Sequence, residues 1–522
     1  MQLTIDTIQV TVKAGTTLMQ AAASVGITIP SLCYREGHGN HPSCMICMVK
    51  DLGNNRLIPS CAFPAEEGMN IQTHSPEINE FRREALELLL SDHLGNCDAP
   101  CRRSCPASMN IPEMNRLIAD GRFEEAFLVI REDIALPQVM GYICPAPCEK
   151  ACHRSYIDSP VSICLLKRFT AWKQSKTETN AMPPAKPAGR HIAVVGSGPA
   201  GLSAAFYVLR LGHKCTIFDS HSSPGGALRY EISDEKLPKT VLDCEIDSIR
   251  QMGAVFIMNT TVDEKMLQKK LRPGFDAVIL ATGSDADQIV SDFGLNIVEQ
   301  VAQTYHNPVH SPAPGVFVCD NRNRKRPMGI LSLAHGKMAA RTASHYLETG
   351  NLMEVKHPFH SSFGHLLEEE FEEYMKEGIK EKRVEPKNGF MGGFTQEEAI
   401  LEARRCMHCD CRKPQTCKLR QYAGEYGAKQ KHRIPSDQKR ITRSVQHDFV
   451  VYEPQKCIRC GLCIEITERG GESAGLSYIG RGFNVTIGIP FDLSLKEALT
   501  KTAAACVAAC PTGALAWKKN SH

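Results

Sequence analysis

Residues 191–205 read HIAVVGSGPAGLSAA, and this stretch decides the fold of the middle of the chain. An apolar run leads into Gly196, Gly198 and Gly201, which form a G-x-G-x-x-G pattern ahead of residues suited to a helix. The glycines permit a tight turn and the close approach of a pyrophosphate to the helix N-terminus. A second apolar run ends in Asp219, a residue suited to bind a ribose hydroxyl. We therefore predict a Rossmann-like nucleotide-binding domain.

Cysteine groups flank this domain on both sides. The chain has 23 cysteines in 522 residues, and most of them fall into groups with the spacing of iron–sulfur ligands. Length and the clustered C-x2-C spacings argue against a disulfide-rich secreted scaffold, whereas zinc, which also binds C-x2-C pairs, stays an alternative. The five groups are Cys33/Cys44/Cys47/Cys61, Cys97/Cys101/Cys105, Cys144/Cys148/Cys152 with Cys164, Cys406/Cys409/Cys411/Cys417, and Cys457/Cys460/Cys463 with Cys510.

Bulk properties exclude several classes of function. The length predicts several domains rather than one core. A net charge of +3 without long basic or acidic runs gives no argument for nucleic acid. No apolar stretch approaches the roughly 20 residues of a membrane span. The N-terminus alternates like a β-hairpin and lacks the apolar core of a signal peptide, so we expect a cytoplasmic protein without a membrane partner.

The first cysteine group follows a hairpin pattern and a short helix-like segment at residues 17–24. Two irons that share four thiolates need two ligands close together and two from either side, which a β-grasp loop can supply. The spacing resembles the [2Fe–2S] domain at the start of the large iron–sulfur subunit of bacterial NADH:quinone oxidoreductase, a domain also found in bifurcating hydrogenases and formate dehydrogenases. The resemblance implies one [2Fe–2S] cluster on Cys33, Cys44, Cys47 and Cys61.

The stretch HLGNCDAPCRRSCPAS (residues 93–108) and its continuation GYICPAPCEKACHRS resemble another family. They look like the N-terminal domain of the glutamate synthase small subunit and of dihydropyrimidine dehydrogenase, which holds two [4Fe–4S] clusters. That family opens with an additional Cys, whereas this chain has His93, and the NADH:quinone family also uses a His-x3-Cys opening. The resemblance implies one cluster on His93, Cys97, Cys101 and Cys152 and a second on Cys105, Cys144, Cys148 and Cys164.

Two of these ligands leave an alternative open. His93 can also be read as a surface histidine at a helix end, and Cys164 as a small buried hydrophobe. Cys164 closes the element Pro160–Cys164, slightly earlier than the family places its ligand.

Further motifs of the glutamate synthase small subunit follow the Gly-rich turn. PGGALRY at 224–230, KLPK at 236–239 and AVILATG at 277–283 match its pattern, and PGVFVCD at 314–320 resembles the element that places an Asp on the flavin ribityl chain. The resemblance implies bound FAD. The residues expected to contact it are Gly196, Gly198, Pro199, Ala200, Gly201, Asp219, Gly226, Arg229, Gly283 and Asp320.

Two departures from that family matter. Only 31 residues, 284–314, stand where the family inserts an NADPH domain, which is too short for a βαβ unit, so we infer that the nicotinamide domain is lost. The family also has a Gly before the Asp of the last element, whereas a basic segment, 321–326, follows Asp320 here. A retained scaffold that binds nothing or only a nucleotide is therefore the alternative to a flavin site.

The last two cysteine groups lie near the C-terminus. Four cysteines within 12 residues, Cys406, Cys409, Cys411 and Cys417, can wrap one [4Fe–4S] cluster, with zinc as the alternative. Cys457, Cys460 and Cys463 with Cys510, which precedes a proline, form half of a bacterial ferredoxin pattern and predict one further [4Fe–4S] cluster. Cys506 is then a bystander or a substitute ligand.

Together these patterns predict a multidomain fold of α/β and α+β type. The predicted segments are a β-grasp [2Fe–2S] domain at 1–78, an α-helical domain with two [4Fe–4S] clusters at 79–173, a linker at 174–190, a Rossmann-like FAD domain at 191–350, an extension with one cluster at 351–440, and a C-terminal ferredoxin-like domain at 441–522. The predicted cofactors are one [2Fe–2S] cluster, about four [4Fe–4S] clusters and FAD.

A chain with several clusters is most simply an electron relay. We expect an electron-transfer subunit of a multi-subunit oxidoreductase, without a catalytic acid or base of its own. The fusion pattern implies an NADH-binding flavoprotein and a thioredoxin-like [2Fe–2S] subunit as partners. Ferredoxin and a hydrogenase, formate dehydrogenase or other reductase module are the further partners it implies. The alternatives are a stand-alone NAD(P)H-dependent oxidoreductase or transhydrogenase, and a scaffold with vestigial clusters.

Overall fold

The computed structural model describes residues 1–39, 41–175, 188–283, 286–295, 300–303, 308–319, 328–353, 358–364, 366–431 and 441–518. The chain forms two compact units, and each is built from segments that are distant in sequence. The first unit contains Met1–Ala99, His357–Glu377 and Met407–His522, and the second contains Pro100–Lys356 and Gly378–Cys406.

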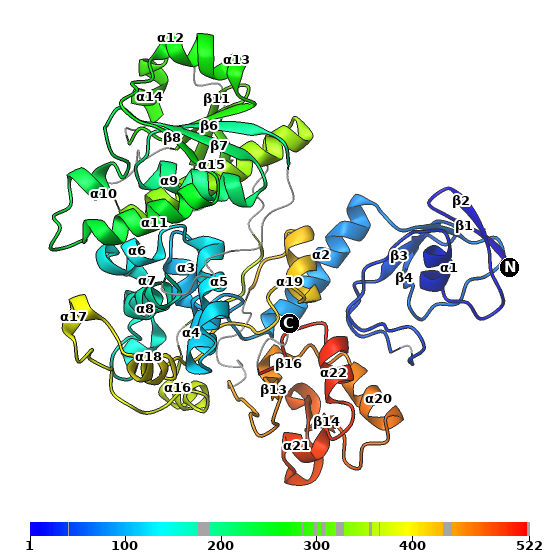
Figure 1. Ribbon diagram of the computed structural model, residues 1–522. Helices are drawn as coiled ribbons and strands as arrows, with labels where there is room; N and C mark the ends of the chain where they lie inside the picture. Colours follow the sequence, from blue (N-terminus) through cyan, green and yellow to red (C-terminus); the bar gives the residue numbers. More distant parts are fainter. Residues whose placement is uncertain are drawn as a thin grey trace. The chain divides into compact units, whose positions relative to one another are not determined.

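The first unit begins with a five-stranded sheet in the order β2-β1-β5-β3-β4, in which β1 and β5 are parallel and the other pairs are antiparallel. Its apolar face packs against α1, which starts with a capping box between Thr17 and Gln20. The elements, drawn in blue in Figure 1, are β1 (Gln2–Ile5), β2 (Ile8–Thr11), α1 (Leu18–Ser24), β3 (Met48–Asp51), β4 (Arg56–Pro59), β5 (Asn70–Gln72) and α2 (Pro76–Ser91).

The remainder of the first unit is made of short elements around a second apolar core. β13 pairs with β16 and β14 pairs with β15, both antiparallel, while α20 contacts α22. The elements are α16 (Glu368–Met375), α19 (Lys418–Glu425), β13 (Val450–Tyr452), α20 (Leu462–Arg469), β14 (Ser477–Ile479), β15 (Thr486–Gly488), α21 (Leu495–Ala498), α22 (Ala503–Ala509) and β16 (Leu515–Trp517), with 3-10 turns at Pro454–Lys456, Gly482–Asn484 and Pro490–Asp492.

The second unit opens with a group of helices, coloured cyan in Figure 1. α6 packs on α8, α4 on α5, and α3 on α7, while α18 from the far end of the unit contacts α4 and α8. The elements are α3 (Pro100–Ser104), α4 (Ile111–Ala119), α5 (Phe123–Asp133), α6 (Pro137–Ile143), α7 (Pro147–Lys150), a 3-10 turn at His153–Tyr156, α8 (Ile163–Ser175), α17 (Gly389–Gly392) and α18 (Gln396–Ala403).

The rest of the second unit is a seven-stranded sheet in the order β10-β11-β12-β9-β6-β7-β8, parallel from β12 to β8 and antiparallel at β10 and β11. Figure 1 shows α12 to α14 on one side of it, with α9 and α15 on the other. The elements are β6 (His191–Val195), α9 (Pro199–Arg210), β7 (Lys214–Phe218), α10 (Ala227–Tyr230), α11 (Lys239–Gln251), β8 (Val255–Ile257), α12 (Glu264–Met266), a π-helical turn at Leu267–Leu271, α13 (Arg272–Gly274), β9 (Ala277–Leu280), α14 (Ala286–Asp292), β10 (Gln300–Gln303), β11 (Pro308–Ala313), β12 (Val316–Cys319) and α15 (Gly329–Thr349).

The local predictions for this unit are confirmed where the pattern was strong. The strand and helix expected on either side of the Gly-rich turn are β6 and α9. The segment proposed at 351–440 is divided between the units: 351–356 and 378–406 belong to the second unit, and 357–377 and 407–440 to the first. No helix in the described ranges is long and apolar enough to cross a membrane.

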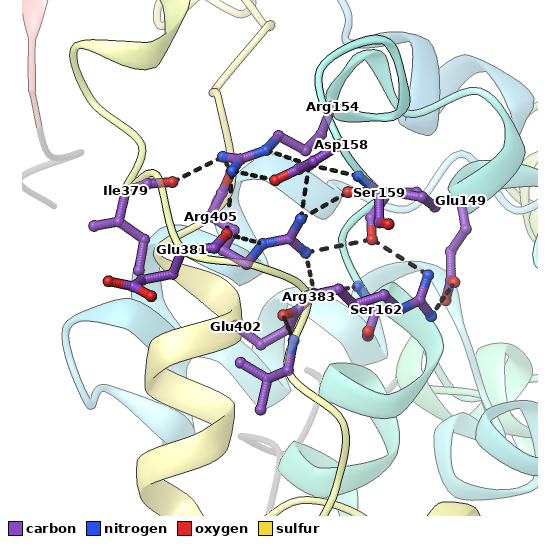
Figure 2. A network of polar contacts seen from close by, with 12 residues as sticks. Glu149, Arg154, Asp158, Ser159, Ser162, Ile379, Glu381, Arg383, Glu402 and Arg405 are labelled. Carbon is purple, nitrogen blue, oxygen red and sulfur yellow. Dashed lines mark hydrogen bonds and ion pairs between the residues drawn. The ribbon is translucent and has the colours of Figure 1, made fainter.

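Buried arginines fasten the segment 378–406 to the helices of the second unit (Figure 2). Arg405 is 0 % exposed and donates to the carbonyl of Ser159 at 2.8 Å and to the carboxylate of Asp158 at 2.9 Å. Arg154, 1 % exposed, donates to the same Asp158 carboxylate and, at 3.1 Å, to the carbonyl of Arg405. Glu402 balances these charges, because it accepts from Arg405 at 2.9 Å.

Glu402 therefore supports a large part of this junction. One of its oxygens accepts from the backbone of Ser162 at 2.8 Å and the other from the backbone of Val384 at 2.8 Å. We expect Glu402→Ala to cost about 3–5 kcal/mol of stability, because it removes one of the two carboxylate partners of buried Arg405 and the acceptor of two backbone N–H groups. Glu397→Ala, on the exposed face of the same helix, should change stability by less than about 0.5 kcal/mol. Urea unfolding of both variants measures the difference, and equal midpoints would refute the role of Glu402.

Candidate iron–sulfur and dinucleotide sites

The four cysteines of the first group are brought together beside the N-terminal sheet, and all four are buried. The sulfurs of Cys33 and Cys44 lie 3.3 Å apart. Hydrogen bonds from the thiols of Cys44 and Cys61 lower the pKa of Cys33 to about 2, and a hydrogen bond from Cys61 lowers the pKa of Cys47 to about 7. The four sulfurs thus form one connected set, in which thiolate, the ligand form of cysteine, is already favoured at two positions.

A buried arginine, which the sequence analysis missed, holds the loop that carries two of these cysteines. Arg82 of α2 is 0 % exposed and donates to the carbonyls of Ile46 at 3.1 Å and Met48 at 3.0 Å, on either side of Cys47. It also donates to the hydroxyl of Tyr426 at 3.2 Å. The guanidinium satisfies carbonyls that the irregular loop would otherwise leave buried without a partner.

A second set gathers in the second unit where α6, α7 and α8 meet. Cys144 directly follows α6, Cys148 lies on α7 and Cys164 on α8. A hydrogen bond with Cys164 raises the pKa of Cys144, and Cys164 also bonds the thiol of Cys148. Burial raises the pKa of Cys105, and Cys144 is near enough to raise it further. These four cysteines are the set that the sequence predicted for one [4Fe–4S] cluster.

A third set does not follow the sequence grouping. The backbone N–H of Cys411 donates to the carbonyl of Cys97 at 3.2 Å, although 313 residues (98–410) separate the two. Burial raises the pKa of Cys417 to about 12, and the charges of Cys411 and Cys97 contribute. The sulfur of Cys97 also lies 3.2 Å from the hydroxyl of Ser361. Cys97, Cys411 and Cys417 are therefore neighbours within the first unit.

His93 belongs to the same neighbourhood. It is 7 % exposed, and burial followed by the nearby charge of Lys456 lowers its pKa to about 4, so the ring is neutral. The ring hydrogen-bonds the backbone of Lys456, while Nδ1 has no hydrogen-bond partner. The positive charge of Lys456 also opposes the rise that burial causes in the pKa of Cys411. A neutral imidazole held through one nitrogen, with the other nitrogen unpaired, has the arrangement of a histidine metal ligand.

The C-terminal set is Cys457, Cys460, Cys463 and Cys510. After burial, the charges of the other three cysteines are the largest causes that raise the pKa of Cys463. Cys506 is 0 % exposed, and its sulfur lies 3.8 Å from the carbonyl oxygen of Cys463, which fits a packing role. Burial raises its pKa to about 11.

The three sets of the first unit border one another. One apolar core contains Cys33 and Cys44 of the first set, Cys417 of the third and Cys460 of the C-terminal set. The charge of Cys33 also raises the pKa of Cys460, and the charge of Cys510 raises the pKa of Cys417. No group of three or more His, Cys, Asp or Glu side chains in the described ranges is arranged to hold a single metal ion. What the structure does show is cysteines in adjoining sets, with the donor chemistry of iron–sulfur clusters.

The division into two units passes through two of the predicted ligand groups. Cys101, on α3, and Cys152 belong to the second unit, whereas His93 and Cys97 belong to the first. Cys406 belongs to the second unit, whereas Cys409, Cys411 and Cys417 belong to the first.

The Gly-rich turn borders a cavity of about 760 Å³ in the second unit. A Cβ at Gly196 would lie 2.3 Å from the carbonyl oxygen of Ala281, and one at Gly201 would lie 1.8 Å from the carbonyl oxygen of Gly196. Only glycine fits at either position, since no Cβ tolerates such contacts. Gly226 has φ +50° and would clash with Gly198 at 2.7 Å if it carried a side chain. The predicted residues Pro199, Ala200 and Gly283 also line the cavity.

Asp219 holds this turn in place from the end of β7. One carboxylate oxygen accepts from both the backbone N–H and the hydroxyl of Ser197, each at 2.6 Å, and the other accepts from the backbone of His221 at 2.9 Å. Burial alone would raise the pKa of Asp219, but the hydrogen bonds from Ser197 and His221 outweigh it and lower the pKa. Asp219 is therefore ionised and lies at the cavity wall, where a ribose would meet it.

Two predicted flavin residues behave differently. Arg229 is not among the cavity-lining residues and pairs instead with Asp243. Asp320 lies outside the described residues. The structure adds Thr260 and Ser332, which no motif marked, to the cavity lining, and Ser332 comes from the first turn of α15. Thr282 of the AVILATG motif lines it as well. The close approach of α15 to α9 depends on Gly336, where a Cβ would lie 2.1 Å from the carbonyl oxygen of Ala200.

Comparison with protein families supports this description. Residues 1–76 match the 2Fe-2S iron-sulfur cluster binding domain, residues 91–179 match the dihydropyrimidine dehydrogenase domain II, 4Fe-4S cluster, and residues 194–254 match the NAD(P)-binding Rossmann-like domain. The chain thus contains 2Fe–2S and 4Fe–4S cluster domains and a Rossmann-like nucleotide-binding domain.

Several oxidoreductase subunits are similar to parts of the chain. The glutamate synthase [NADPH] small chain of Mycobacterium tuberculosis is 39% identical over 215 residues, covering 40% of this chain and 43% of its own length. The NADP(+)-dependent formate dehydrogenase subunit beta of Moorella thermoacetica is 35% identical over 210 residues, covering 36% of this chain and 30% of its own. The NADPH-Fe(3+) oxidoreductase subunit beta of Geobacter sulfurreducens is 37% identical over 194 residues, covering 36% and 28%. The chain therefore spans less than half the length of these relatives.

The role of Asp219 gives a direct test of the cavity. We expect Asp219→Ala to weaken binding of an adenine dinucleotide at least about tenfold, because Ser197 and His221 lose the acceptor that orders the turn. Fluorescence titration of the purified chain with FAD and with NADP+ measures the change. Asp243→Ala, which removes the partner of Arg229, is the matched control and should bind as the unmodified chain does. Unchanged affinity in Asp219→Ala would remove Asp219 from the binding site.

Proposed function

We propose that this chain is the electron-relay subunit of a multi-subunit oxidoreductase. The observation that carries the proposal is the apolar core that cysteines of three ligand sets share, among them Cys33, Cys417 and Cys460. Electron transfer requires neighbouring redox centres, and this core brings three sets into contact within one unit. The similarity of large parts of the chain to oxidoreductase subunits points to the same role.

Two ligand sets of this proposal keep the sequence grouping. Cys33, Cys44, Cys47 and Cys61 would hold a [2Fe–2S] cluster, in keeping with the family match over residues 1–76. Within the match over residues 91–179, the second set would hold a [4Fe–4S] cluster. Its ligands are Cys105, Cys144, Cys148 and Cys164.

A further proposed set replaces two sequence groupings. His93, Cys97, Cys411 and Cys417 would ligate one [4Fe–4S] cluster, supported by the bond between the backbones of Cys97 and Cys411 and by the unpaired Nδ1 of His93. The second unit is inserted between the two halves of this set, so the spacing of the sequence concealed it.

The remaining cysteines complete the proposal. Cys457, Cys460, Cys463 and Cys510 would hold a [4Fe–4S] cluster in a ferredoxin-like C-terminal region, with Cys506 as a buried neighbour. Cys101, Cys152 and Cys406 remain in the second unit. The positive charge of Arg405, which directly precedes Cys406, works against the rise that burial causes in the pKa of Cys152. They are the candidates for a fourth [4Fe–4S] site. The iron of these clusters would supply the one-electron chemistry, and the protein supplies thiolates, burial and fixed charges.

The Rossmann-like cavity is proposed to hold FAD. Its volume, the Gly-rich turn and the ionised Asp219 suit an adenine dinucleotide, and the Gly residues would admit the pyrophosphate to the N-terminus of α9. The described residues between β9 and β12 form α14, β10 and β11 rather than a second Gly-rich unit. FAD, when bound, supplies two-electron exchange, while Asp219 and Ser197 fix its binding turn.

The partners proposed for the relay follow from the same likenesses. An NADH-binding flavoprotein with a thioredoxin-like [2Fe–2S] subunit would exchange electrons with the chain, and a hydrogenase, formate dehydrogenase or other reductase would stand at the other end, with ferredoxin as a further carrier. A stand-alone NAD(P)H-dependent oxidoreductase is the second candidate. It is favoured by the match of residues 194–254 to an NAD(P)-binding domain and by the NADPH named for the relatives.

Iron counting in paired variants distinguishes the two ligand groupings. If Cys97 and Cys411 hold the same cluster, Cys97→Ser and Cys411→Ser should each lose roughly four iron atoms per chain, and the double variant should lose no more than either. Under the grouping by sequence the double variant would lose roughly twice as much. Cys506→Ser is the matched control and should keep its iron. Additive losses would overturn the proposed set.

The relay role is tested by reduction of the purified chain without partners. We expect NADH or NADPH alone to leave the visible absorption of the clusters unchanged, whereas dithionite bleaches it. We also expect anaerobic purification from the native cell to bring down a flavoprotein and a second redox subunit. Bleaching by NADPH of a chain that purifies alone would instead establish the stand-alone oxidoreductase.

A further inference from the structure

Lys167 is a buried lysine that no step of the proposed relay uses. It lies on α8, one turn after Cys164, and is 3 % exposed. Its Nζ lies 4.0 Å from the sulfur of Cys164. A buried ammonium is costly and usually either loses its proton or finds a partner of opposite charge.

Four cysteines provide that opposite charge. Cys164, whose sulfur lies 4.0 Å from Nζ, is grouped with Cys105, Cys144 and Cys148, and cysteines that ligate a cluster are thiolates. These four are the proposed ligands of one [4Fe–4S] cluster. Lys167 therefore carries a positive charge against the ligand shell from within the protein.

No carboxylate neutralises this charge directly. In the described part of the chain Lys167 forms no ion pair with an acidic side chain, and the acidic groups around the site are engaged elsewhere. Glu149 accepts from the backbone of Cys164 at 2.9 Å and pairs with Arg383 at 3.2 Å. Glu245 accepts from two backbone N–H groups at the start of α6, both at 2.9 Å.

The first unit contains a contrasting lysine. Lys456 is 1 % exposed, and its charge favours the thiolate of Cys411. Unlike Lys167, it has an ion-pair partner, because its Nζ lies 2.6 Å from the carboxylate of Glu453. Arg443 pairs with the same carboxylate at 3.1 Å. Lys456 thus belongs to a compensated ionic group, whereas Lys167 forms no ion pair in the described residues and acts on the carboxylate of Glu245 only from beyond ion-pair distance.

We propose that Lys167 sets the reduction potential of the cluster held by Cys105, Cys144, Cys148 and Cys164, raising it through a positive charge that lies beside the ligands without an ion-pair partner. The inference rests on the proposed function, because it requires that cluster. Uptake of one electron makes the ligated cluster more negative by one charge, and no bond is made or broken. A fixed positive charge in a low-dielectric interior stabilises the reduced form more than the oxidised form. Lys167 is a positioning residue for charge and is not a ligand.

The consequence for the relay is an ordering of potentials. The cluster beside Lys167 becomes an easier electron acceptor than it would be with the same four thiolates alone. Electrons that enter the second unit would therefore settle there before they move on. The compensated pair at Lys456 gives its neighbouring set no comparable shift.

Redox titration of the full chain, followed by EPR, tests the proposal. We expect Lys167→Met, which keeps the length of the side chain, to move the midpoint of one [4Fe–4S] signal to a more negative potential at unchanged iron content. Lys167→Arg keeps the charge and should restore most of the shift. The matched control is Lys173→Met on the same helix, whose Nζ bonds the side chain of Gln396 at 2.6 Å; it should leave every midpoint unchanged.

Two outcomes would overturn the inference. One is a Lys167→Met chain with full iron content and unaltered midpoints. The other is an equal shift in Lys167→Met and Lys167→Arg, which would assign the effect to packing rather than charge. If Lys167→Met loses its cluster, Lys167→Gln and Lys167→Arg decide by the same comparison. A Cys105→Ser variant that retains all iron would instead refute the ligand set of the proposed function.

Discussion

Buried arginines that donate to backbone carbonyls beside the cysteines are the interaction on which the rest of this structure depends. Loops that carry cluster ligands cannot form regular ladders, so their carbonyls need other donors. Arg82 serves the loop around Cys47, and Arg154 donates to the carbonyl of Arg405, next to Cys406. Arg443 donates to the carbonyls of Met407 and His408 at 3.3 and 3.0 Å. Each guanidinium offers five donors in a fixed geometry, which suits it to this task.

These arginines also tie together segments that are far apart in sequence. Arg82 reaches Tyr426, and Arg405 reaches Asp158 and Ser159. Their charges are matched by carboxylates, as in the pairs of Arg405 with Glu402 and of Arg443 with Glu453. A buried ion pair adds little net stability, but removal of one partner is costly. The pairs therefore specify which segments meet, and through them which cysteines meet.

Charge placement gives the two units different electrostatic characters. In the first unit the lysine near Cys411 is neutralised by Glu453, whereas in the second unit Lys167 acts on four cysteines without a carboxylate partner. The cavity beside the Gly-rich turn differs from these sets in its chemistry, because its lining combines glycines, threonines and the ionised Asp219 with apolar side chains such as Phe218 and Leu228.

The sequence by itself determined the local units, and the tertiary structure decided how the cysteines combine. The glycines at 196 and 201, the helix α1 and the grouping of Cys33, Cys44, Cys47 and Cys61 were readable because the physical constraint is local: a turn without space for a Cβ, a short helical pattern, or cysteines within one small segment. The motif at 224–230 led us to expect Arg229 at the flavin, and in the structure this side chain pairs with Asp243. The neighbourhood of His93, Cys97, Cys411 and Cys417 was hidden, because a whole folding unit lies between its halves. The spacing of cysteines along the chain limits the distance between them only when they are near in sequence. Contacts such as that between Cys97 and Cys411 form only when distant segments pack together, and buried ion pairs hold such segments in place.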